Sequence, residues 1–246
     1  MSDDILDETR RSWNLATQAH NRHKRDQSAF LRDGGSTLFP ESDEAIAFAT
    51  GLAHDAKIPA TFLESEAQAF LDQAAPRCFD VVFMSYGALI WIADIAKLFR
   101  GIARVLAPGG RYVNLDFHPL VGCFDEDLRL SREPYFAPGH VFSGPVGDDV
   151  GASGGALAPS GFVADPRDEP AFDNPHKAHS YQHSIADQLN AMIAAELQIA
   201  TVREYPYANG CRVNPALVER DGRRFTMPDG APSLPLMLGV VAVRGA

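Results

Sequence analysis

The residues best suited to bind a ligand or move a proton follow two short apolar runs of the chain. Six such residues form two groups: Ser85, Tyr86 and Gly87, then Asp116, Phe117 and His118. A histidine titrates near neutral pH, so His118 could act as a general base. Equally, His118 could cap the backbone at the Pro119 turn, and the other five could be ordinary turn residues.

A strand–helix–strand unit should position these residues. Phe79–Met84 is an apolar run, typical of a strand buried on both faces. Asp94 is a good N-cap for a helix to Leu106, whose apolar residues recur with a 3.6-residue period. Pro108-Gly109-Gly110 should stop that helix, and Arg111–Phe117 is predicted as the second strand. The strands should be parallel, with their carboxyl ends on the edge where open α/β sheets bind ligands.

The composition fits a globular protein and argues against several partners. The chain has 246 residues, 46% of them hydrophobic, and a net charge of −10. Binding to nucleic acid or to anionic membranes needs an excess of basic residues, so neither is expected. Cys78, Cys123 and Cys211 show no disulfide or zinc spacing, and the sequence begins without a signal pattern. A cytoplasmic location is therefore expected.

We expect a single domain over residues 1–246, in four consecutive parts. These are an N-terminal helical cap (1–41), an α/β core (42–119), an irregular insertion or lid (120–183), and a C-terminal helix with antiparallel strands (184–246). The insertion is rich in Gly and Pro but keeps apolar residues, and long loops of this kind are usually lids, binding loops or locally disordered segments. Further predicted elements are helices over 1–32, 42–54, 67–73 and 184–197, and strands over Ile58–Leu63, 199–205 and 236–243.

Several motifs follow one another along most of the chain. They are SWxxATxxHNxHK (12–24), FLRDGGSTLFPE (30–41), SDEAIAFA (42–49), SYGALxW (85–91), LAPGG (106–110), DFHP (116–119) and EYPYANG (204–210). Together they resemble class I S-adenosylmethionine-dependent methyltransferases of a bacterial, small-molecule-type subgroup. The resemblance implies an α/β fold with a Rossmann-like sheet, S-adenosylmethionine as cofactor, and a small molecule as methyl acceptor.

One part of the family pattern is missing. In the family a Gly-rich loop follows the first strand, and an acidic residue after the second strand hydrogen-bonds the cofactor ribose. Both should lie between Glu41 and Ser42, which are adjacent here. The resemblance therefore implies a sheet reduced by two strands, with Ile58–Leu63 paired directly with Phe79–Met84. The lost contacts should cost several kcal/mol of cofactor affinity, at about 1.5–3 kcal/mol per hydrogen bond to a charged group.

The resemblance also implies five cofactor-binding residues. Glu66 stands where the family has an acidic residue near the adenine, although a solvated helix end explains this carboxylate equally well. The other four match the motif beside the sulfonium: Ser85, Tyr86, Gly87 and Trp91. Gly87 would permit close approach and Tyr86 would offer its ring to the cation, while Trp91 suits the core as well. Methyl transfer mainly requires alignment of the reactants, with His118 as the candidate base.

Two groups of histidines lie outside this set. His20 and His23 should share a helix face, and they could close over the pocket or be exposed. His176, His179 and His183 have spacings that a metal site on a helix could use. Asn174-Pro175 instead favours a loop that leads to a helix start.

Two functions of different class follow. The chain is a methyltransferase, with activity impaired by the missing loop, or it is a non-catalytic subunit-like protein derived from one. In the second case it could form a homo-oligomer through the exposed edge of its shortened sheet. A metal-dependent hydrolase that uses the histidines of residues 176–183 is a third alternative.

Overall fold

A four-stranded sheet forms the core of the computed structural model, which describes residues 3–33, 59–131, 133–158, 160–164 and 172–245. Its strands, in spatial order, are β1 (Phe79–Ser85), β2 (Leu106–Phe117), β9 (Met237–Arg244) and β5 (Leu197–Tyr205). β1 and β2 are parallel, and β9 is antiparallel to both β2 and β5. The Rossmann-like α/β fold is confirmed, as is the antiparallel pair at one end of the sheet.

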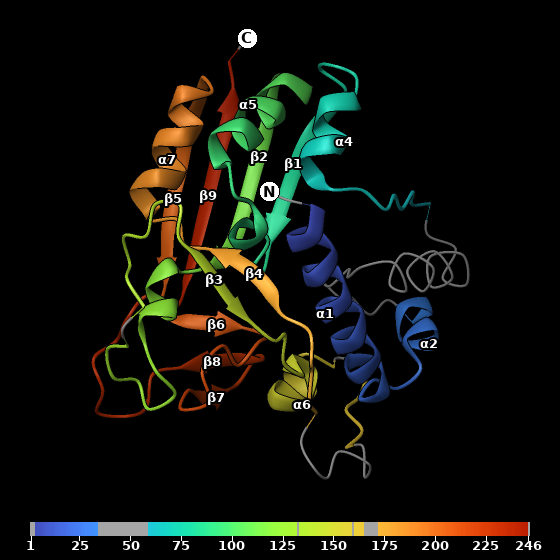
Figure 1. Cartoon of the computed structure of the whole chain (residues 1–246), viewed down its shortest axis with the longest axis vertical. Helices are drawn as coiled ribbons and strands as arrows, with labels where there is room; N and C mark the ends of the chain where they lie inside the picture. The colour runs from blue at the N-terminus through green and yellow to red at the C-terminus, as the bar shows by residue number, and fades with distance from the viewer. Residues whose placement is uncertain (1–2, 34–58, 132, 159, 165–171, 246) are drawn as a thin grey trace.

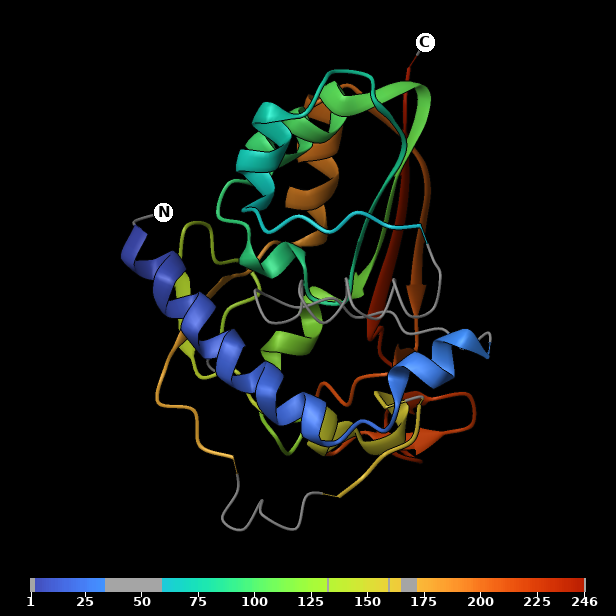
Figure 2. The same cartoon turned by 90° about the vertical axis from the view of Figure 1, so that its right-hand side faces the viewer.

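Three helices cover one face of this sheet, as Figure 2 shows. They are α4 (Ala67–Gln73), α5 (Ile95–Val105) and α7 (Ile185–Ala194). The predicted cap of α5 is confirmed, because the Asp94 side chain accepts a hydrogen bond from the Lys97 N–H at 2.8 Å. The apolar stripe of α5 is buried against the sheet, where Phe99 meets Tyr112 edge to face at 5.2 Å.

The predicted extent of α5 is confirmed, because the helix ends at Val105 with Leu106 as its C-cap. The predicted start of the second strand at Arg111 is too late, since β2 begins at Leu106 and contains Pro108-Gly109-Gly110. The Arg244 guanidinium donates to the carbonyls of Arg104 and Leu106 and so satisfies groups at the end of the helix. By contrast, α7 ends before the predicted Leu197, which opens β5.

The opposite face of the sheet is bare in the described parts of the chain. Val81 and Phe83 of β1 are 54% and 52% exposed, so the prediction of a strand buried on both faces is wrong. The predicted strand over Ile58–Leu63 is also wrong for residues 59–63, which form no strand beside β1. Ile58, the predicted helix over 42–54 and the Glu41–Ser42 junction lie outside the described residues. In the described parts of the chain no strand pairs with the outer edge of β1, and these apolar side chains are open to solvent.

The remaining elements gather beyond the carboxyl ends of β1 and β2 (Figure 1). Helices α1 (Asp3–Arg22) and α2 (Gln27–Arg32) confirm the prediction for residues 1–32. The insertion forms the hairpin of β3 (Val141–Gly144) with β4 (Ala178–Tyr181), the helix α6 (Asp149–Ser153) and the 3₁₀ helices η2 (Pro119–Cys123) and η3 (Gly154–Ala156). A small sheet has the order β6 (Tyr207–Asn209), β8 (Arg224–Thr226), β7 (Val218–Arg220).

Helix α1 packs across the insertion and the 3₁₀ helix η1 (Leu89–Trp91) that follows β1. The Ser12 hydroxyl donates to the His176 carbonyl at 3.0 Å, and the Asn174 amide donates to the Ser12 carbonyl at 3.0 Å. Trp13 meets Trp91 edge to face at 5.5 Å. These contacts bring the start of the chain beside the ends of the core strands. None of the described helices has the length and hydrophobicity needed to cross a bilayer.

Candidate functional site

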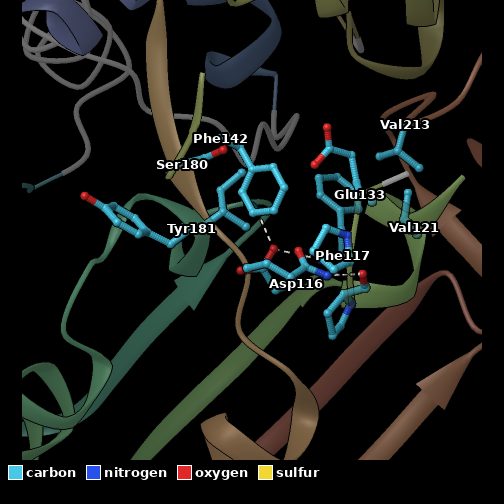
Figure 3. Close-up of a pocket in the computed structure, with 14 residues that line it drawn as sticks. Asp116, Phe117, Val121, Glu133, Phe142, Ser180, Tyr181 and Val213 are labelled. Carbon is cyan, nitrogen blue, oxygen red and sulfur yellow. Dashed lines mark hydrogen bonds between the residues drawn. The ribbon is translucent and has the colours of Figure 1, made fainter. Parts of the chain in front are cut away.

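A cavity of about 320 Å³ opens at the carboxyl ends of β1 and β2 (Figure 3). The strand ends contribute Gly87, Asp116 and Phe117 to its wall, and the insertion contributes Phe142 and Tyr181. This is the edge of the sheet where the sequence places its candidate residues, and where open α/β sheets bind ligands. The other three of the six candidates at the strand ends do not line this wall.

Asp116 holds the turn after β1 in place. Its carboxylate accepts hydrogen bonds from the backbone N–H groups of Gly87, of Leu89 at 3.3 Å and of Phe117 at 2.7 Å. Burial raises the pKa of the Asp116 carboxyl, and these backbone donors oppose that shift. Sequence reasoning placed Asp116 at this edge but gave it no role. The available signal was an acidic residue at a strand end beside a Gly-containing turn.

The turn itself has a backbone conformation that few residues adopt. Tyr86 and Gly87 both have positive φ angles, 53° and 87°. Glycine adopts such angles without strain, so Gly87 suits a close approach of backbone to a ligand. The Tyr86 hydroxyl accepts a hydrogen bond from the Asn209 amide at 3.1 Å, and its ring packs edge-on against Phe117. Tyr86 does not line the cavity itself but supports Phe117, which does.

His118 is engaged at both ring nitrogens and only 5% exposed. Its Nδ1 accepts a hydrogen bond from the Leu120 N–H at 3.1 Å, which caps η2. The neutral ring then carries its proton on Nε2, which donates to the Glu204 carboxylate at 2.9 Å. A role as general base would require one of these contacts to open, and it stays a prediction.

A family model is similar to about a third of the chain. Residues 36–114 match the model of a methyltransferase domain. No protein with a curated description matches the chain.

Solved structures of S-adenosylmethionine-dependent methyltransferases from three organisms are similar to the chain. The protein from Clostridium acetobutylicum is 10% identical with a TM-score of 0.48, over 83% of this chain and 73% of that one. The one from Methanosarcina mazei is 15% identical with a TM-score of 0.47, over 88% and 85%. The one from Mesorhizobium loti is 21% identical with a TM-score of 0.42, over 82% and 77%.

The other predicted cofactor-binding residues lie outside the cavity wall. Glu66 is exposed and caps α4, where its carboxylate accepts from the Ala69 N–H at 2.7 Å. Trp91 packs against Trp13, in agreement with the alternative of a core role. Ser85 is the last residue of β1 and pairs with Leu115. The structure thus joins Gly87 to Asp116 and Phe117 in one wall, while cofactor contacts of Glu66, Ser85 and Trp91 stay predictions.

His20 and His23 are buried, and they contact the insertion instead of lining the cavity. His23 Nε2 lies 2.7 Å from the Asp148 carboxylate, and its Nδ1 lies 2.9 Å from the Val163 carbonyl. Both partners are acceptors, so this geometry is satisfied when both ring nitrogens of His23 donate. His20 Nε2 lies 3.2 Å from the Gly147 carbonyl. We call the His23–Asp148 contact the clasp, because it fastens the end of α1 to the start of α6.

The histidines of residues 176–183 do not share a helix face. His179 lies on β4, where its Nε2 is 2.9 Å from the Glu8 carboxylate of α1. His183 lies between β4 and α7 and donates from Nε2 to the Ile92 carbonyl at 2.7 Å. Burial lowers the pKa of His183, which favours the neutral ring. In the described residues no three metal-ligating side chains gather at one point.

Proposed function

We propose that this chain transfers the methyl group of S-adenosylmethionine to a small molecule bound in the cavity. The observation that carries the proposal is the cavity itself, at the carboxyl ends of β1 and β2 and beside the Gly87 turn. Its volume of about 320 Å³ lies within the usual range for small-molecule sites, about 300–1,000 Å³.

The described residues fit the sulfonium end of this cofactor. When bound, the cofactor supplies an electrophilic methyl group on a positively charged sulfur. The ring of Phe117 lines the cavity, and aromatic faces attract cations. The Asp116 carboxylate lies at the same strand end and adds negative charge when ionised. The residues that would hold the ribose belong to the block missing between Glu41 and Ser42.

The chain's own contribution to methyl transfer would be alignment and exclusion of water. Asp116 fixes the Gly87 turn, and Tyr86 braces Phe117 from behind. Phe142 and Tyr181 cover the cavity from the insertion. A positioned reaction of this kind needs little further help, because alignment alone can lower a barrier by about 7–11 kcal/mol.

Calorimetric titration with S-adenosylmethionine and S-adenosylhomocysteine tests the proposal directly. We expect both to bind with a Kd tighter than about 100 μM, equivalent to roughly −5.5 kcal/mol. Replacing Gly87 with Ala should weaken binding, because it strains the positive φ and places a methyl group at the cavity wall. Gly222→Ala is the matched control, since Gly222 has φ +76° in open space far from this wall.

A folded, monodisperse chain that binds neither compound would contradict the proposal. One observation then favours the second candidate, a subunit-like protein without catalysis. Among the described residues the uncovered face of the sheet exposes Val81 and Phe83, and contiguous exposed apolar surface marks interaction sites. In that case the particle mass should exceed that of a monomer, as for a homo-oligomer paired along β1.

A further inference from the structure

The wall of the cavity combines aromatic rings with carboxylates. Phe117, Phe142 and Tyr181 contribute rings, and Asp116 and Glu133 contribute acidic side chains. Among the described residues that line it, none is Lys, Arg or His. Figure 3 shows Asp116 and Phe117 at the end of β2, with Phe142 and Glu133 across the pocket from them. A ligand here therefore meets acidic groups and ring faces together.

The carboxylates of Asp116 and Glu133 differ in how deeply they are buried in the cavity wall. Asp116 is 5% exposed, so its charge when ionised is weakly screened by solvent. Glu133 is exposed and stands on the insertion side of the wall, where it can attract a ligand that enters from solvent. Both disfavour a phosphate or a carboxylate in this space. Both favour a cation, and the surrounding rings add to that preference.

We propose that the methyl acceptor is an apolar small molecule that carries an ammonium group. This inference rests on the proposed function and names its substrate class. The apolar part of the acceptor contacts Phe142 and Tyr181, and the ammonium group faces Glu133. The proposal concerns recognition in the cavity and leaves open which atom of the acceptor receives the methyl group.

The cofactor carries two other cations that such a wall could serve, its sulfonium and its α-ammonium group, and S-adenosylhomocysteine keeps the second. Saturation with S-adenosylhomocysteine separates an acceptor site from a site for the cofactor. If the wall binds the methyl acceptor, its site stays open when S-adenosylhomocysteine is bound. If the wall serves only the cofactor, bound S-adenosylhomocysteine fills the site. The binding of matched probes to the saturated full-length chain therefore reports on the acceptor.

The experiment compares three probes of similar size in the presence of saturating S-adenosylhomocysteine: 2-phenylethylamine, 2-phenylethanol and 3-phenylpropionate. We expect the amine to bind at least about tenfold tighter than the carboxylate, a difference of about 1.4 kcal/mol. Glu133→Gln should weaken amine binding about three- to tenfold and leave the alcohol unchanged, in keeping with one exposed charge pair. Glu126→Gln is the matched control, because Glu126 is exposed and lies outside the wall.

The outcomes separate this inference from the proposed function. Equal or tighter binding of the carboxylate to a chain that binds S-adenosylhomocysteine overturns the ammonium assignment and leaves the methyltransferase proposal intact. The ammonium assignment is also overturned if Glu126→Gln weakens amine binding as much as Glu133→Gln does. It is overturned as well if the amine no longer binds when the chain is saturated with S-adenosylhomocysteine. Failure to bind S-adenosylhomocysteine at all overturns the proposed function instead.

Discussion

Replacing Asp116 with Ala should lower the free energy of unfolding by about 3–5 kcal/mol, because its buried backbone donors remain unpaired at about 1–3 kcal/mol each. Three backbone N–H groups, those of Gly87, Leu89 and Phe117, lose their acceptor together. The burial that raises the pKa of Asp116 shows that the carboxylate is itself expensive to hold there. Alanine removes the desolvation cost of the carboxylate but offers no acceptor to the three N–H groups. The unpaired N–H groups therefore make the net change in the free energy of unfolding destabilising.

The same substitution should abolish detectable cofactor binding even where the chain stays folded. The turn after β1 loses the group that fixes it, and Gly87 no longer holds its place in the cavity wall. Urea denaturation and calorimetry measure the two effects separately. Unchanged affinity in a folded Asp116→Ala protein would show that the turn is fixed by other contacts.

Asp116→Asn serves as the control and gives a pH dependence. The amide keeps one acceptor oxygen, so we expect a smaller loss of about 1–2 kcal/mol. Because the pKa of Asp116 is raised in the folded chain, its protonated carboxyl contributes stability. This contribution is complete below the ordinary Asp pKa of about 3.9 and is lost as the pH rises through the pKa of Asp116 in the folded chain. The stability advantage of the unsubstituted chain over the Asp116→Asn variant should therefore shrink from acid toward neutral pH. An advantage that grows instead would mean that the folded pKa is lowered.

Asp148→Ala should have the second large effect, because it opens the clasp. His23 would keep its contact with the Val163 carbonyl but lose the carboxylate at 2.7 Å. Asp148 also caps α6, where it accepts from the Gly151 N–H at 2.9 Å. A buried donor that loses its acceptor typically costs about 1–3 kcal/mol, and the ring of His23 and the Gly151 N–H both lose theirs. We expect a loss of stability of that order, with α1 detaching before the sheet unfolds.

Limited trypsin digestion reads out this detachment. Lys24 and Arg25 follow the clasp directly, and the Arg25 N–H is bonded to the Gly161 carbonyl at 3.1 Å. If opening is fast relative to cleavage, a loss of about 3 kcal/mol raises cleavage here by roughly 100-fold. Asp148→Asn should raise the cleavage rate much less than Asp148→Ala, because Asn can cap α6 and can still form a hydrogen bond with a neutral His23. Similar cleavage of both variants would show that the negative charge of Asp148, and not only its hydrogen bonds, holds the clasp.

The sequence was sufficient to predict the elements whose signals are local. Asp94 and the apolar period specify α5, and its length makes the flanking strands parallel. The position of the site follows, because carboxyl ends of parallel strands meet at one edge. The bare face of β1 was not predictable in the same way. An apolar run shows that Val81 and Phe83 suit burial, but not whether a neighbour is there to bury them.

Contacts over long sequence distances account for the rest. His23 meets Asp148 across 125 residues, so neither residue alone indicates a clasp. The role of Asp116 depends on backbone N–H groups, which every non-proline residue of a turn carries and which no side-chain pattern reveals. The histidines of residues 176–183 had helical spacing, but pairing of β3 with β4 placed His179 on a strand.

The contact between Trp13 and Trp91 gives the molecule a built-in optical reporter. The chain has two tryptophans, and these are both of them. They come from α1 and from the segment after β1, with ring planes at 83° to one another. The indole emission of the protein therefore originates where α1 touches η1, and docking of α1 can be followed in solution without any added fluorophore.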